Sequence, residues 1–114
     1  MTAAPELRLH SLRKIEIIVR AEDRLIVEES LRSADVGGWT MIRDVAGLGH
    51  SGFHEGRRMF NDQSGLLMFI GVSSPDIIAE VAKAMGALFE RMPGVMFLSD
   101  VEVLRSHYFV RAGE

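Results

Sequence analysis

The chain has 114 residues, of which 47% are hydrophobic and 25% charged, and a formal net charge of −3. This length and composition predict one globular domain rather than a disordered segment. The 13 basic residues form no continuous stripe, which argues against nucleic-acid binding. The absence of cysteine excludes disulfides, thiolate catalysis and cysteine-ligated zinc. No segment has the apolar length of a signal peptide or a membrane span, so we expect a cytoplasmic protein.

The first half of the chain predicts a strand, a helix and a second strand. Residues 14–20 are rich in β-branched side chains and predict the first strand. Residues 24–34 carry apolar side chains at helical spacing and predict a helix that Asp23 or Glu22 can cap. The apolar positions of this helix are Leu25, Ile26, Val27 and Leu31. Residues 39–45 alternate in polarity and predict the second strand.

Residues 46–64 form the longest segment without helix or strand periodicity. The segment combines four glycines and two histidines with an arginine pair, and it has too few apolar residues to contribute to a core. We therefore predict a long loop, and we expect this loop to be the functional element of the domain.

The second half predicts another strand, helix and strand. Residues 66–72 are an apolar run of strand length. Ser74 can cap a helix over residues 75–91 that has Pro75 in its first turn and one continuous apolar stripe. The fourth strand is predicted from Val95 to about Leu104.

The two halves form similar strand–helix–strand units, which predict a split βαβ architecture of the α+β class. In this architecture both helices cover one face of an antiparallel sheet. The other face needs solvent or a partner, and Trp39, Met41, Met68 and Ile70 are large apolar residues for a solvated surface. We therefore predict that the chain forms oligomers.

Gly47, Gly49 and Gly52 have the spacing of a dinucleotide-binding motif. They follow a predicted strand but open no helix, so the spacing does not predict a Rossmann site. Taken alone, these glycines fit either a flexible loop root or an anion-binding turn.

Three groups of charged or histidine side chains are candidate sites. His50 and His54 are four residues apart, but neighbouring glycines disfavour the helix that would align them on a metal. The adjacent arginines Arg57 and Arg58 fit a solvated loop tip as well as a binding site for phosphate or carboxylate. Arg105 and His107 would share one face of the fourth strand, where a ligand site and a plain surface cation are equal alternatives. No catalytic constellation is present.

Two stretches of the chain resemble the PII signalling family. Residues 38–52 contain Gly-Trp-Thr at the start of a strand and a Gly-Leu-Gly turn, and residues 99–109 read Ser-Asp-Val-Glu-Val-Leu-Arg-Ser-His-Tyr-Phe. The resemblance covers residues 14–109 and is strongest to the branch tied to inorganic carbon, whose members are associated with bicarbonate transporters and carboxysomes. It implies a ferredoxin-like βαββαβ homotrimer in which residues 46–64 are the T-loop. Within this single domain of residues 1–114, residues 1–12 are expected to be a flexible N-terminal segment and residues 110–114 a tail.

The resemblance also implies ligands and ligand-binding residues. ADP or AMP would bind in each cleft between subunits, at positions matching Gly38, Trp39, Thr40, Gly47, Gly49, His50, Gly94, Arg105 and His107. Bicarbonate or another T-loop effector would bind at Ser51, Gly52, Arg57 and Arg58. The resemblance implies no cofactor, no metal and no catalytic residue.

The chain also departs from the nitrogen-sensing members of the family. These members use a glutamine at the T-loop root and a lysine before strand four, where this chain has Ser51 and Val95. The short loop before strand four favours ADP or AMP over ATP, and the absence of a T-loop tyrosine argues against uridylylation.

We therefore expect a non-enzymatic sensor of inorganic-carbon and energy status. Its partner would be a bicarbonate transporter or a carboxysome component. The alternatives are a nitrogen-type PII sensor of ATP, ADP and 2-oxoglutarate, and a small ferredoxin-like enzyme or metal-binding trimer using His50, His54 and His107.

Overall fold

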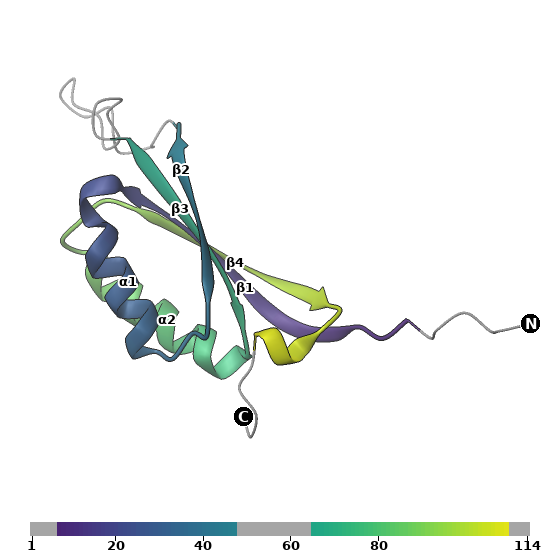
Figure 1. The fold of residues 1–114 in the computed structure, drawn as a ribbon. Helices are drawn as coiled ribbons and strands as arrows, with labels where there is room; N and C mark the ends of the chain where they lie inside the picture. Colours follow the sequence, from purple (N-terminus) through teal and green to yellow (C-terminus); the bar gives the residue numbers. More distant parts are fainter. Residues whose placement is uncertain (1–6, 48–64, 110–114) are drawn as a thin grey trace, which may run out of the picture.

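A computed structural model describes residues 7–47 and 65–109 (Figure 1). In chain order the elements are β1 (His10–Arg20), η1 (Ala21–Asp23), α1 (Arg24–Ser33), β2 (Trp39–Val45), β3 (Leu66–Ser73), α2 (Pro75–Leu88), β4 (Val95–Val103) and η3 (Ser106–Tyr108). The predicted order of strands and helices is thereby confirmed.

The four strands form one antiparallel sheet in the order β2-β3-β1-β4. Both helices lie on the same face of this sheet (Figure 1). The chain therefore has the α+β, ferredoxin-like βαββαβ fold that the sequence predicted. Strands that pair in this sheet are not adjacent in sequence, because at least one helix or residues 46–65 lie between them in the chain.

The core lies between the helices and the sheet. Alternate residues of β1 and β3 point to this side and meet residues spaced along α1 and α2. The cluster consists of Ile15, Ile17, Val19, Val27, Leu31, Val36, Leu67, Phe69, Ile78, Val81 and Met85. Burial of these side chains is the main force that holds the helices on the sheet.

The sheet face opposite the helices carries apolar side chains on either side of the charged pair Lys14 and Glu16, and its apolar members differ from the prediction. Trp39 and Met41 pack against the core on the helix side, so their assignment to the exposed face was wrong. The error arose because the polarity alternation of β2 does not say which of its two faces meets the helices. Met68 and Ile70 alternate with the buried Phe69 and do lie on the open face. By the same register Ile42, Val95 and Phe97 share that face and are exposed.

Several element boundaries differ from the predicted ones. β1 begins at His10, and residues 10–12, which were assigned to the flexible N-terminal segment, pair with β4. α2 ends at Leu88 rather than at residue 91. On α1 only Val27 and Leu31 are buried, whereas Leu25 and Ile26 remain exposed. The four apolar residues form a stripe on α1 that is wider than the part of the helix that the sheet covers.

The helix ends use backbone more than side-chain hydrogen bonds. Asp23 and Ser74 occupy the predicted N-cap positions, but neither side chain makes a capping bond. Asp23 instead accepts a bond of 2.9 Å from Arg20 Nε, and this bond raises the pKa of the Arg20 guanidinium. At the end of α1, Val36 N donates to Leu31 O at 3.0 Å while Asp35 adopts a left-handed φ of 69°. This is a Schellman motif without glycine, and it turns the chain into β2.

Neither helix in the described ranges is long and apolar enough to cross a membrane.

Candidate functional site

One hollow of about 620 Å³ opens on the sheet face that faces away from the helices. We call it the C-terminal hollow. Its lining residues are Gly38, Trp39, Thr40, Ile70, Val72, Val103, Leu104, Arg105, Tyr108 and Phe109. These residues come from the start of β2 and the glycine before it, from β3, and from the end of β4 and the segment after it, so only the folded domain brings them together.

The floor of the C-terminal hollow is set by strand register. Thr40 of β2 is the cross-strand partner of Ile70 in β3, and Val72 follows two residues later on the same face. Gly37 and Gly38 precede β2, are exposed, and have no atom within 4 Å of an added Cβ. The backbone entering β2 is therefore open to close approach by a ligand.

The wall of the hollow is the segment that follows β4. The chain turns through η3, where Tyr108 N donates to Arg105 O at 3.2 Å and Phe109 N donates to Ser106 O at 2.9 Å. The Oγ of buried Ser73 donates to Phe109 O at 3.2 Å and ties this turn to the end of β3. Figure 1 shows η3 lying beside the ends of β3 and β4.

Arg105 is the one charged side chain among the described residues that line the C-terminal hollow. Its Nη1 donates to Tyr108 Oη at 3.0 Å, and its Cζ lies 4.2 Å from the centre of the Tyr108 ring. An apolar hollow that contains a single guanidinium suits a ligand with a flat apolar part and an anionic part.

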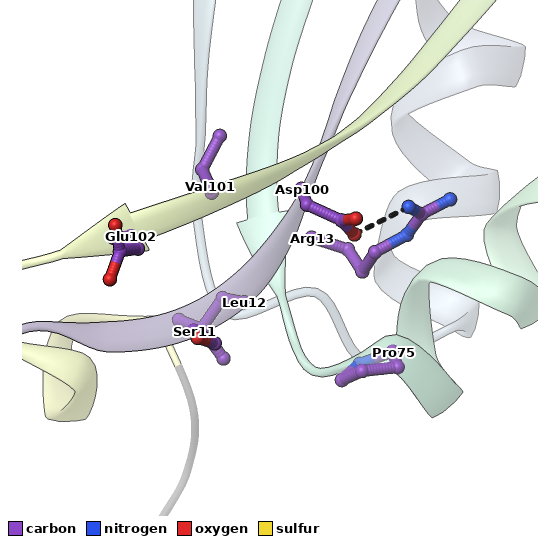
Figure 2. A pocket seen from close by; sticks show the side chains of 7 residues that line it. All are labelled: Ser11, Leu12, Arg13, Pro75, Asp100, Val101 and Glu102. Carbon is purple, nitrogen blue, oxygen red and sulfur yellow. Dashed lines mark hydrogen bonds and ion pairs between the residues drawn. The ribbon is translucent and has the colours of Figure 1, made fainter.

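A second hollow of about 440 Å³, which we call the Arg13 hollow, lies beside the N-terminus of α2 (Figure 2). Here Arg13 Nη1 binds Asp100 Oδ1 at 2.6 Å across the β1–β4 pair, and Glu102 adds another carboxylate. The lining thus has two carboxylates against one cation whose charge is already paired. The Arg13 hollow is therefore a poorer place for an anion than the C-terminal hollow.

The structure divides the predicted nucleotide-binding residues into two groups. Gly38, Trp39, Thr40 and Arg105 line the C-terminal hollow. Gly47 and Gly94 lie at the opposite end of the sheet, after β2 ends and before β4 begins. A seven-residue strand such as β2 spans about 20 Å, so one chain does not bring the two groups to one small ligand.

Arg105 and His107 do not share a strand face, because β4 ends at Val103 and His107 lies in η3. The His107 ring stands 4.8 Å from the Tyr108 ring, outside the lining of the C-terminal hollow. The prediction of a continued strand was therefore wrong at this point. The predicted site residues Gly49, His50, Ser51, Gly52, Arg57 and Arg58 lie outside the described residues, as does His54.

The apolar lining of the C-terminal hollow and the aromatic neighbour of Arg105 were not predicted from the sequence. Ile70 was expected only on an exposed sheet face and Val72 only within a strand, and Tyr108 was noted only as part of the 99–109 stretch. An i, i+3 spacing between Arg105 and Tyr108 was a usable signal, because one helical turn places such residues side by side.

A metal site is not formed by the described part of the chain. Within residues 7–47 and 65–109, no three histidine, cysteine, aspartate or glutamate side chains gather closely enough to hold an ion.

The model of the family described as nitrogen regulatory protein P-II matches residues 12–108. The chain belongs to the P-II family. Proteins of this family are regulatory signalling proteins and form trimers. No curated protein sequence gives a significant match to the chain.

Solved structures of PII-like proteins are similar to the chain over most of its length. CPII, a nitrogen regulatory PII-like protein from Thiomonas intermedia K12 bound to ADP, AMP and bicarbonate, has 29% sequence identity and a TM-score of 0.80. That match covers 93% of this chain and 100% of CPII. The same protein bound to ADP and bicarbonate matches with 28% identity and a TM-score of 0.77, over 91% of this chain and 99% of CPII. A putative PII-like signaling protein from Thermus thermophilus, at 14% identity and a TM-score of 0.72 over 90% and 98%, shares the fold.

Proposed function

We propose that this P-II protein is a non-enzymatic sensor that binds ADP or AMP in clefts between the subunits of a homotrimer, with bicarbonate as modulator. The main support is that Gly38, Thr40 and Arg105 line one hollow. The chain is also 29% identical to CPII, whose structure was solved with ADP, AMP and bicarbonate bound.

The chemistry of the C-terminal hollow supports an adenine nucleotide. Ile70, Val72 and Leu104 offer apolar surface to a flat base, and the Thr40 hydroxyl offers a donor and an acceptor to its edge. Arg105 offers a guanidinium to phosphate, where charge-assisted bonds are about twice as strong as neutral ones. Arg105 is the only cation among the described lining residues, which favours a monophosphate or diphosphate over a triphosphate.

The separation of the two residue groups supports a cleft between subunits. Gly47 and Gly94 are a strand length away from the C-terminal hollow of their own chain. In a ring of identical chains, however, one end of a subunit can face the other end of its neighbour. Such a ring would place Gly47, Gly49, His50 and Gly94 of one subunit beside Arg105 and His107 of the next. We assign Ser51, Gly52, Arg57 and Arg58 to the bicarbonate effector in the same arrangement.

The response in this proposal is a population shift of the T-loop, residues 46–64. A ligand changes partner binding only if it prefers one loop state, and the coupling equals that preference. The partner would be a bicarbonate transporter or a carboxysome component, which would make the protein a cytoplasmic reporter of inorganic carbon and energy status.

Calorimetry tests the ligand part of the proposal. The chain is titrated with ADP, AMP and ATP, each with and without bicarbonate. We expect binding of ADP and AMP, weaker binding of ATP, and a change in affinity when bicarbonate is present. Absence of heat for all three nucleotides, in a preparation whose mass is that of a trimer, would reject the proposal.

Mixed trimers test the cleft between subunits. Arg105→Ala disables one group and Gly47→Val the other, and a Cβ at position 47 would lie in ordinary contact with Leu66 Cδ1, at 3.9 Å. If each cleft joins two chains, trimers reassembled from equal amounts of both variants regain ADP binding in about a quarter of their clefts. If both groups act within one chain, the mixture binds no better than either variant.

A nitrogen-type sensor is the second candidate, favoured by the description of the matching family. It differs in requiring 2-oxoglutarate together with Mg-ATP. Titration of 2-oxoglutarate in the presence of Mg-ATP separates the two functions, and we expect no binding because Ser51 and Val95 stand where that ligand pair needs glutamine and lysine.

A further inference from the structure

The only charged group among the described lining residues of the C-terminal hollow is held by an aromatic side chain that the sequence analysis gave no role. Arg105 makes two contacts with Tyr108, a hydrogen bond of 3.0 Å from Nη1 to Oη and a cation–π contact of 4.2 Å to the ring centre. Both residues are exposed and both line the hollow. An exposed arginine free of such contacts would sample many rotamers.

Tyr108 is itself held in place by the turn in which it lies. Tyr108 N donates to Arg105 O at 3.2 Å, which closes the backbone around the same two residues. The turn is joined to β3 through Ser73, whose buried hydroxyl donates to Phe109 O at 3.2 Å. The aromatic ring therefore stands on a segment that is fixed at both ends, by β4 and by Ser73.

We propose that Tyr108 is a positioning residue that holds the Arg105 guanidinium ready to bind the phosphate group of a nucleotide. The proposal rests on the function proposed above and adds a residue to its site. Tyr108 uses one of the five N–H donors of Arg105 and leaves four for an anion. Because the guanidinium is already placed, less conformational freedom is lost when phosphate binds.

This role predicts that Tyr108 acts only through Arg105. Tyr108→Phe keeps the ring and removes the hydrogen-bond acceptor, and we expect ADP affinity to fall about 3- to 10-fold. Tyr108→Ala also removes the cation–π contact and should lower ADP affinity further. Adenosine has no phosphate, so its affinity should change less than about 2-fold in both variants.

A double-mutant cycle distinguishes positioning from a direct contact or a structural effect. In an Arg105→Ala background, Tyr108→Phe should leave ADP affinity unchanged, because the group that it positions is gone. If Tyr108→Phe lowers ADP affinity equally in both backgrounds, or lowers adenosine affinity as much as ADP affinity, the proposal is wrong.

A measurement without nucleotide keeps this test separate from that of the proposed function. In the unliganded ¹⁵N-labelled protein, the ring current of Tyr108 should shift the Arg105 Nε–Hε resonance, and Tyr108→Ala should return it to the position of an unstacked arginine. A resonance that does not respond to Tyr108→Ala overturns the positioning role even if ADP binds. Failure of the unmodified chain to bind ADP, with the resonance responding as expected, rejects the nucleotide function alone.

Discussion

The two ends of the sheet carry glycines that the sequence assigned to one site, yet their surroundings differ. At the end where β2 begins, Gly38 is exposed and an added Cβ would meet no atom within 4 Å. At the end where β4 begins, a Cβ on Gly94 would overlap the Phe89 ring and reach Val19 Cγ1 at 3.0 Å. We call the first the open end and the second the packed end. Packing alone therefore explains the glycine at position 94, whereas no neighbour among the described residues explains the one at position 38.

Arg105→Ala should cause the largest of the expected effects, a loss of ADP affinity at the open end. Loss of a charge-assisted bond to phosphate costs about 1.5–3 kcal/mol, which corresponds to about a 10- to 150-fold weaker affinity for ADP. Calorimetry measures this loss, and the melting temperature should stay within about 2 °C because the side chain is exposed. Arg13→Ala is the matched control, since it removes a cation from the Arg13 hollow and should leave ADP affinity unchanged. Equal losses in both variants would mean that net charge, not position, matters.

Gly94→Ala should affect stability at the packed end. The added methyl must displace the Phe89 ring, and overpacking of this kind costs about 1–3 kcal/mol in the free energy of unfolding. Chemical denaturation measures the change, and Phe89→Leu in the same chain should recover part of it by removing the ring. Gly86→Ala is the control, because this exposed glycine in α2 has open space around it and alanine there should stabilise by about 0.5–1 kcal/mol. Unchanged stability with weakened ADP binding would instead identify Gly94 as a ligand contact.

Most of the fold could be predicted because each element carries its own periodic signal. β2 was predicted with its observed bounds, and β3 and α2 with their observed first residues. Apart from shifted element ends, the main error was the placement of Trp39 and Met41 on the exposed face, because an alternating pattern has no directional information. Which face of an alternating strand meets the helices depends on pairing with β3, a contact between segments far apart in the chain.

The site could be predicted only in part for a related reason. Gly38 and Thr40 came from resemblance to a family, Arg105 came from the resemblance and from its place near the predicted fourth strand, and all three line one hollow. Tyr108 and the Ser73–Phe109 bond were not found, because they depend on a chain reversal after β4, where the apolar pattern predicted a continued strand. A hydrogen bond that joins residues 36 apart leaves no local sequence signal.

Asp44 offers a smaller test of the packed end. It adopts a left-handed φ of 58° at an irregularity in the pairing of β2 with β3, between Arg43 and Val45. Aspartate and asparagine tolerate this conformation, whereas a β-branched residue does not. Asp44→Val should therefore lower the free energy of unfolding by about 1–2 kcal/mol, and Asp44→Asn should change it by less than about 0.5 kcal/mol. Thermal denaturation of both variants measures the difference, and equal melting temperatures would show that the irregularity relaxes without cost.

Thr40→Val should give the smallest effect and separates base recognition from phosphate recognition within the open end. Valine keeps the shape and strand propensity of threonine, so stability should change by less than about 0.5 kcal/mol at this exposed position. The lost hydroxyl should weaken ADP and adenosine alike by about 2- to 10-fold, because a neutral hydrogen bond to the base is worth less than a charged one to phosphate. Thr40→Ser keeps the hydroxyl and should retain most of the affinity. A variant that weakens ADP but not adenosine would move Thr40 from the base to the phosphate, and the base would then be recognised by the apolar lining alone.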